Sequence, residues 1–412
     1  MADFATLANY YRDYWKNYDR LGFSRKATPT ARMMKTDGDL FMEGRQAFIV
    51  MPTTQDFSFT NDITKALDNP ALPDRWTLPG PTASFGQIEV DGQTFMRKTA
   101  AVIPVVDQRI AFGIQTFHEQ RERRLWSDSS GQLGTVGAIT GTTTVTTPVS
   151  SDTFYNVPPN ATVVFNPNKT GNAGTIRACT YKVSGKVLNE DGTAQLTLTR
   201  LTGAVVPVSG DYIYVDGTYD AAPPGILSFL PATLPTTGDS FLGLDRSPFA
   251  NLLAGWRFAF EGSIKGTIIK SMSTFGKMVA PQLASGDFTI CLSDQDWTKL
   301  QLEFEGQVHY YPESMRRFGT NAIVVETQWG PVPCITIPAL SNSDQALYGI
   351  DWTSFHNAPV GPVPHIMMDD GLVFARIGSG GAGTKDASAM RLRAYDYSFC
   401  SRPATNFRAK TA

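Results

Sequence analysis

Residues 105–126 read VVDQRIAFGIQTFHEQRERRLW, and the rest of the chain is organised around this stretch. Its apolar residues recur every three or four positions, which predicts a helix with one apolar side of about six turns and roughly 33 Å. That side would be formed by Val106, Ile110, Ile114, Phe117 and Leu125. Glu119 and Arg123 stand four residues apart and are expected to pair. The residues SDSSG at 127–131 end the helix.

Most of the chain outside this helix reads as strands and turns. Residues 131–222 contain short β runs separated by turn residues and no helical pattern, which predicts a β-rich segment. Residues 322–327 (AIVVET) and 333–340 (PCITIPAL) read as buried strands, 365–377 as a hairpin, 390–400 as an alternating strand and 298–306 as a β or mixed segment. Further helices are expected at 263–280 and at 3–21.

Two segments are predicted to contact a neighbouring subunit. The helix at 3–21 carries an aromatic stripe that is costly to leave in water, formed by Tyr11, Tyr14, Trp15 and Tyr18. Asp91-Gly92 is a hairpin signal, and the apolar residues around it have no obvious local partner. Those residues are Ile88, Val90, Phe95 and Met96.

Composition excludes several functional classes. The net charge of −2 does not predict a nucleic-acid-binding protein, whose domains are usually basic. The 36 glycines and 26 prolines among 412 residues exceed the ordinary ~12% and favour a turn-rich fold. The sequence contains no apolar run of 18 residues, so it predicts no membrane span. The four scattered cysteines predict buried thiols in a reducing compartment.

The sequence predicts no catalytic, cofactor-binding or metal site. A GxSxG elbow is absent, and the four histidines show no metal-ligand spacing. Residues 378–383 match GxGxxG, but no apolar helix follows them, so a glycine-rich loop is the better interpretation. This absence favours a structural role.

The order of these elements resembles the major capsid proteins of tailed double-stranded-DNA bacteriophages with the Hong Kong 97 fold. The phrases that carry the resemblance are SDSSGQLGTVGAITGTTTV at 127–145, GDYIYVDGTYDAAPPGI at 210–226 followed by FLGLDRS, and RLRAYDYSFCSRPATNF at 391–407. The resemblance implies an α+β chain. Its expected parts are an N-terminal arm (1–45), an extended loop region (46–104), a spine helix with peripheral strands and a β-rich insertion (105–235), an axial domain (236–365), and a return to the peripheral domain with a C-terminal tail (366–412).

The resemblance also implies function and partners. The expected function is an icosahedral shell built from hexamers and pentamers of this chain, assembled in the host bacterial cytoplasm and enclosing double-stranded DNA that it contacts non-specifically. The expected further partners are a portal protein and a decoration or cement protein. Because Met1 leads straight into the arm helix, a separate scaffolding protein, or none, is expected, with no cleavage of the arm. No membrane contact is expected.

Three alternatives stay open at this point. An encapsulin-type compartment has the same fold and encloses protein cargo. A β-rich hydrolase with a carbohydrate-binding insert would be an enzyme. Another virion component, such as a tail or decoration protein, would also be structural.

Overall fold

The structure of the protein is a computed structural model. The structure describes residues 33–35, 46–49, 75–78, 82–91, 103–170, 175–190, 193–219, 222–260, 262–283, 287–304, 323–340, 345–359, 365–367, 375–376 and 387–410. Within these ranges, no helix is long and apolar enough to cross a membrane.

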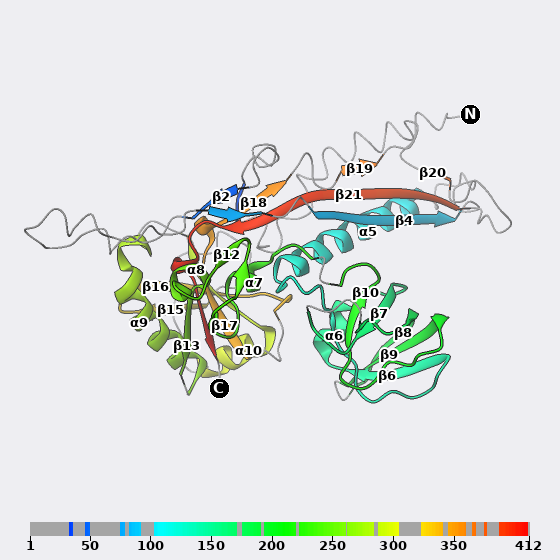
Figure 1. Cartoon of the computed structure of the whole chain (residues 1–412), viewed down its shortest axis with the longest axis horizontal. Helices are drawn as coiled ribbons and strands as arrows, with labels where there is room; N and C mark the ends of the chain where they lie inside the picture. The colour runs from blue at the N-terminus through cyan, green and yellow to red at the C-terminus, as the bar shows by residue number, and fades with distance from the viewer. Residues whose placement is uncertain are drawn as a thin grey trace, which may run out of the picture.

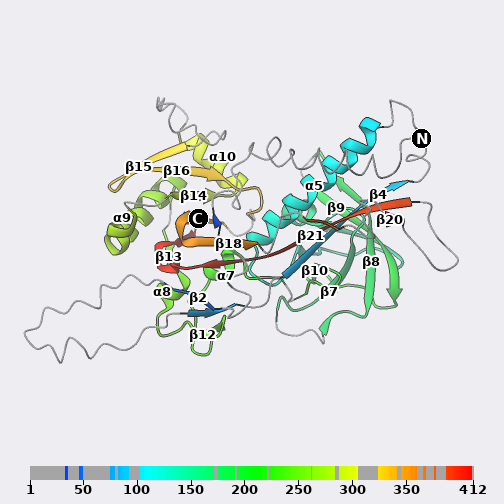
Figure 2. The same ribbon diagram turned by 90° about the horizontal axis from the view of Figure 1, so that it is seen from above.

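Two long strands and one long helix dominate the molecule. We call them the arm, which is distinct from the N-terminal arm expected at residues 1–45. Strands β4 (Thr82–Asp91) and β21 (Ala387–Cys400) pair along ten residues of β4, and helix α5 (Ile103–Leu125) packs beneath them (Figures 1 and 2). The predicted helix is confirmed, and its side chains Ile110, Ile114, Phe117 and Leu125 are buried. Glycines let the layers approach closely, since a Cβ on Gly113 would lie 2.4 Å from the Ile88 side chain.

The strands of the arm pair across long distances in the sequence. The hairpin predicted at Asp91-Gly92 stays a prediction, because residues 92–102 lie outside the described ranges. β4 pairs with β21, about 300 residues further along the chain, in a register that joins Thr82 to Asp396 and Asp91 to Ala387. β19 (His365–Met367) and β20 (Ala375–Arg376) each pair antiparallel with β21. They therefore run in the same direction, and the hairpin predicted at 365–377 is wrong.

The strands of the arm belong to a six-stranded sheet that also includes β1 (Met34–Lys35) and β18 (Phe355–Pro359). Another six-stranded sheet, which we call the second sheet, lies beyond the inner end of the arm. Its order is β13 (Trp256–Ala259), β22 (Phe407–Lys410), β17 (Ala346–Asp351), β14 (Phe288–Leu292), β16 (Gly330–Thr336) and β15 (Ile323–Thr327). The strand predicted at 322–327 is confirmed as β15, and the one predicted at 333–340 is confirmed only up to Thr336, where β16 ends. Alternate residues of these strands enter different cores: Ile290 lies on the face covered by helix α9 (Ile264–Leu283), and Cys291 lies on the opposite face.

Helix α10 (Asp294–Glu303) occupies a segment that the sequence places among β or mixed structure. The Ser293 side chain caps it by accepting from the Asp296 N–H, and Asp294 and Asp296 lie in its first turn. Glu303 at its other end accepts from the backbone N–H groups of Ile264 and Lys265 at 2.7 and 2.8 Å. The end of α10 therefore caps the start of α9.

The C-terminal segment contributes to both sheets. β21 belongs to the arm, and β22 is an inner strand of the second sheet, between β13 and β17. Conversely, β18 (Phe355–Pro359) follows β17 directly and pairs with β21 of the arm. The chain thus passes twice between the two sheets.

Residues 134–215 form a separate β-rich unit with its own core, as the sequence predicts. Its sheet order is β5 (Gly134–Thr135), β10 (Tyr212–Val215), β7 (Thr162–Asn166), β8 (Cys179–Leu188), β9 (Ala194–Gly203) and β6 (Thr144–Val149). Its core includes Val145, Phe165, Tyr181 and Leu198. Helix α6 (Ser151–Asn156), capped by Ser150, was not expected.

Short elements complete the described fold. They are β1 (Met34–Lys35, parallel to β18), β2 (Gln46–Phe48) with β3 (Arg75–Thr77), β11 (Ser240–Phe241) with β12 (Leu244–Asp245), α7 (Ile226–Phe229), α8 (Ala250–Ala254), and the 3-10 helices η5 (Trp352–Ser354) and η6 (Pro403–Thr405). All four cysteines are buried and free, which confirms the predicted buried thiols.

Candidate functional site

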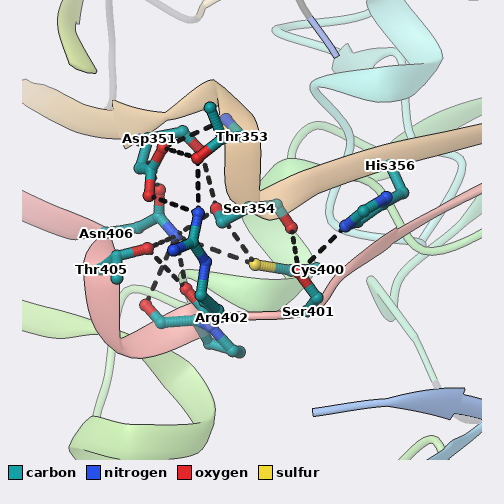
Figure 3. Close-up of polar contacts among 10 residues, drawn as sticks. Asp351, Thr353, Ser354, His356, Cys400, Ser401, Arg402, Thr405 and Asn406 are labelled. Atoms are coloured by element: carbon teal, nitrogen blue, oxygen red, sulfur yellow. Dashed lines mark hydrogen bonds and ion pairs between the residues drawn. The ribbon is translucent and has the colours of Figure 1, made fainter. Parts of the chain in front are cut away.

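The two passages between the sheets meet in one buried polar cluster, which we call the joint. It is formed by residues 351–356 and 400–406, and Figure 3 shows their side chains pointing toward one another. The first passage runs from β17 through η5 into β18, and the second from β21 through η6 into β22. The joint is therefore where the arm is fastened to the second sheet.

Asn406 is the centre of the joint and is fully buried. Its Oδ1 accepts from the Asp351 N–H at 2.8 Å. Its Nδ2 donates to Ser354 Oγ and to the Arg402 carbonyl, each at 3.0 Å (Figure 3). One amide thus joins both passages, and its backbone carbonyl also accepts from Trp256 of β13 at 3.0 Å.

The backbone around Asn406 leaves no room for another side chain. Gly255 lies against the Asn406 carbonyl, where a Cβ would come within 2.9 Å, and its φ of 69° is one that glycine tolerates best.

An ion pair reinforces the joint. Arg402 Nη2 donates to Asp351 Oδ2 at 3.2 Å and also to Thr353 Oγ1. The other carboxylate oxygen, Asp351 Oδ1, accepts from the backbone N–H of Thr353 at 3.1 Å and from its hydroxyl at 2.6 Å. The Asp351 side chain is 1% exposed, so these partners take the place of water around the buried carboxylate.

Burial favours the uncharged forms of the thiol and the imidazole of the joint. Burial raises the pKa of the Cys400 thiol to about 12, although hydrogen bonds from its surroundings act in the opposite direction, so the thiol stays protonated near neutral pH. Burial, followed by the charge of Arg402, lowers the pKa of His356. Its ring is stacked on Phe399 at 4.8 Å between centroids.

The polar groups of the joint bond mainly to one another and to backbone carbonyls. His356 Nε2 lies 3.0 Å from Ser401 Oγ, but the Ser401 hydroxyl also bonds the Ser354 carbonyl, and Asp351 pairs with Arg402. No group of three or more metal-ligating side chains occurs in the part of the chain that the structure describes. What these contacts do is hold the angle between the arm and the second sheet.

The arm offers an uncovered face on the side away from α5. Phe85 is 66% exposed there, and its ring meets that of Tyr395 edge-on at 6.4 Å. Arg393 lies over the same Tyr395 ring, 5.6 Å from its centroid. This face combines aromatic and cationic groups.

The residues predicted to contact a neighbouring subunit lie mostly outside the described ranges. Of that set, Tyr11, Tyr14, Trp15, Tyr18, Phe95 and Met96 fall there, and for Val90 only the backbone is described. Ile88 is buried within its own chain, packed over Gly113 of α5. The expectation that Ile88 lacks a local partner is therefore wrong, because the pleat of β4 turns it toward the helix.

The β-rich unit is attached at the carboxyl end of α5. Arg123 lies over the Tyr155 ring, 3.8 Å from its centroid, and approaches the Asn156 carbonyl at 3.5 Å. The predicted Glu119–Arg123 pair is therefore wrong, and Glu119 instead accepts from Gln115 at 3.0 Å. Arg123 contacts the β-rich unit instead of a side chain of its own helix.

A second contact of the attachment is an ion pair. Lys169 Nζ lies 2.6 Å from Asp128 Oδ2. Burial alone would raise the pKa of Asp128, but the hydrogen bonds from Lys169 and Ser130 outweigh it, and the pKa is lowered. On the segment that returns from the β-rich unit to α7, a Cβ on Gly225 would lie 2.4–2.9 Å from the carbonyl oxygens of Ser127, Leu125 and Arg124. Both linkers are thus packed tightly against the end of α5.

Sequence reasoning did not identify the joint. Its residues are small polar side chains in two short segments about fifty positions apart, and neither segment has a periodic pattern. The one available signal was residues 391–407, one of the stretches that resemble capsid proteins, and it assigned no role to Arg402 or Asn406.

No protein family matches the sequence, and no curated protein matches it. Among solved structures, the chain is similar to the cyanophage A-1(L) capsid at 9% identity, over 93% of this chain and 93% of that chain, with a TM-score of 0.46. It is similar to the satellite phage P4 procapsid at 7% identity, over 98% of each chain, with a TM-score of 0.39. It is also similar to the SrpI encapsulin of Synechococcus elongatus at 8% identity, over 92% of this chain and 85% of that chain, with a TM-score of 0.38. Phage capsids thus stand among the solved structures to which this chain is similar.

Proposed function

We propose that the protein is a major capsid protein that self-assembles, as hexamers and pentamers, into an icosahedral shell around packaged double-stranded DNA. The observation that carries this proposal is the arm. β4, β21 and α5 form a long, thin body that projects from the second sheet (Figure 1). A body of this shape buries little of its own surface, and it gains stability by lying against neighbouring subunits.

The joint supports the same proposal. A closed shell needs every subunit to hold nearly the same angle between its parts, because an error at one interface is repeated around each symmetric ring. Asn406 and the Asp351–Arg402 pair connect both passages of the chain with directional hydrogen bonds. Such a connection keeps the arm at a set angle to the second sheet.

The surface chemistry is consistent with a container. The near-neutral net charge of −2 suits a wall that does not hold packaged DNA tightly. The exposed Phe85 on the arm provides apolar area that a neighbouring subunit can cover. We infer a structural role and no catalytic one, with a portal, a separate scaffolding protein and a decoration protein as further partners of the shell.

The test is electron microscopy of the purified full-length protein. We expect closed shells hundreds of ångströms across, and particles from infected host cells should contain nuclease-protected DNA and a portal at one vertex. Shells filled with protein cargo instead of DNA would identify an encapsulin-type compartment. A stable monomer at micromolar concentration, with no particles, would refute a shell function.

A further inference from the structure

Two arginines lie side by side on one face of the second sheet. Arg257 of β13 is directly opposite Arg408 of β22, and Arg408 is in turn opposite Tyr348 of β17. Residues directly opposite each other in neighbouring strands share one face, so both arginines lie on the face that carries Tyr348. Arg408 lies over the Tyr348 ring, 5.8 Å from its centroid, and both arginines are half-buried.

A third arginine reaches the same face from the end of β12. Arg246 lies over the Phe241 ring, 4.2 Å from its centroid, and that ring packs against the core on this face. Arg246 Nη1 donates to the Ser228 carbonyl in α7 at 2.9 Å, and Arg257 Nε donates to the Pro231 carbonyl just after α7 at 2.8 Å. The two guanidiniums therefore meet at the carboxyl end of α7.

The positive charge of this cluster exceeds the negative charge paired with it. We call Arg246, Arg257 and Arg408 the arginine triad. Arg246 pairs with Asp239 at 2.9 Å, whereas Arg257 donates only to backbone carbonyls. Within the described residues, Arg408 forms no hydrogen bond or ion pair, and its one contact of this kind is with the Tyr348 ring. Three guanidiniums and one carboxylate thus leave two positive charges without a direct ion pair.

The arrangement is unfavourable as it stands. Like charges directly opposite each other destabilise a sheet. Burial, followed by the charges of Arg246 and Arg408, lowers the pKa of Arg257 to about 10. The Nε groups of Arg246 and Arg408 are buried and have no acceptor among the described residues. Buried donors of this kind are rare in folded proteins, and a bound ion is one of the things that account for them.

The chemistry of the triad indicates which anion it accepts. Guanidinium groups bind oxyanions through pairs of parallel N–H···O bonds, and phosphate is among their preferred ligands. A phosphate group carries about −1.5 to −2 charges at neutral pH, which matches the two unpaired positive charges. Arg246 is only 6% exposed, and this burial favours a small free ion over the continuous backbone of a nucleic acid.

We propose that the arginine triad binds a free phosphate ion. The ion supplies acceptors and negative charge to the guanidiniums of β13 and β22 and connects them to Arg246 at the end of α7. This inference goes beyond the proposed shell function, because every group of the site comes from one chain and no neighbouring copy is needed.

Isothermal titration calorimetry of the unassembled full-length subunit with inorganic phosphate tests the site. The buffer contains chloride at matched ionic strength, so that general screening does not contribute. We expect saturable binding at a single site per chain. Arg408→Gln should weaken it at least about tenfold, because the charged hydrogen bonds of one guanidinium are lost. Arg200→Gln, on β9 of the β-rich unit, is the matched control and should leave the affinity unchanged.

Thermal unfolding separates phosphate binding from a structural role of Arg408. Without phosphate, Arg408→Gln should be as stable as the unaltered protein or more stable, because it removes one of two opposed like charges. Phosphate should raise the unfolding midpoint of the unaltered protein and hardly change that of the variant. A structural arginine would instead give the same loss of stability with and without phosphate, and that result would overturn the inference.

The carboxylate of the cluster gives an independent readout. Asp239→Asn keeps an oxygen that can accept from Arg246 but removes the one negative charge that competes with the ion. It should therefore strengthen phosphate binding. Unchanged or weaker binding in this variant would contradict the site, and this measurement decides the question if circular dichroism shows that Arg408→Gln does not fold.

Three further results would overturn the inference. The absence of saturable phosphate binding would mean that the triad bonds only to its own chain. Equal affinity in Arg408→Gln and the unaltered protein would place the ion elsewhere. A thymidine oligonucleotide that binds more tightly than phosphate, and that loses affinity in Arg408→Gln, would assign the triad to nucleic acid.

Discussion

Replacing Asn406 with alanine should lower the free energy of unfolding more than the same change at an exposed asparagine of the described residues. The substitution removes the acceptor of the Asp351 N–H and two donated hydrogen bonds at 3.0 Å. The Arg402 carbonyl still accepts from the Thr405 hydroxyl at 2.8 Å, so losing the hydrogen bond from Asn406 costs little there. The Asp351 N–H is left buried without its acceptor, which costs about 1–3 kcal/mol, and the vacated volume brings the total to about 2–4 kcal/mol.

Urea unfolding of the unassembled full-length subunit, followed by tryptophan fluorescence, measures this loss. Trp256 and Trp352 report directly, because their indoles bond to groups around the joint, the Ala404 carbonyl at 2.9 Å and Thr289 Oγ1 at 2.6 Å. The matched control is Asn189→Ala, whose side chain makes one exposed hydrogen bond to Thr193 and should change stability by less than about 0.5 kcal/mol. Equal losses for the two variants would refute the view that Asn406 fastens the arm to the second sheet.

Two further perturbations follow from the packing and the charges. Gly113→Ala should destabilise the arm by about 1–3 kcal/mol in thermal or urea unfolding, because its Cβ meets Ile88 at 2.4 Å. The gain in helix propensity, about 1 kcal/mol, does not offset this clash. The control is Gly266→Ala on α9, whose Cβ would lie 3.0 Å from its nearest contact, so the change should be neutral or stabilising. A larger loss of stability for Gly266→Ala than for Gly113→Ala would contradict the packing of α5 on β4. Asp128→Asn should cost stability at neutral pH, since it breaks the pair with Lys169. Because the pKa of Asp128 is lowered by folding, its contribution is complete above the ordinary value of 3.8 and is lost as pH falls through the lowered pKa. The difference between Asp128→Asn and the unaltered protein should therefore close in acid, and a difference that persists unchanged there would exclude this ion pair as its cause.

The local pattern of the sequence predicts a substantial part of this fold. Helix α5 follows from apolar residues at 110, 114 and 117, because a periodicity of 3.6 is satisfied within the segment itself. The β-rich unit follows from short alternating runs between turn residues, and the buried cysteines follow from their number and scatter. Each of these features depends on neighbours in sequence.

Helix α10 shows where the local pattern is ambiguous. Leu300, Leu302 and Phe304 alternate with polar residues and read as a strand. Trp297, Leu300 and Phe304 are also spaced as on a helix, and the Ser293 cap favours the helix. Packing decides between the two, since Leu300 is buried with α9 while Leu302 is exposed.

The tertiary structure alone decided which strands pair and where the joint lies. Nothing in the local pattern of β4 indicates a partner from the other end of the chain, yet the fold pairs it with β21. The pairing then turns Ile88 toward α5 and brings residues 351–356 against 400–406. Asn406 becomes a buried connector only once those two passages meet, because a polar side chain acquires its partners from the surrounding fold and carries no periodic signal of its own.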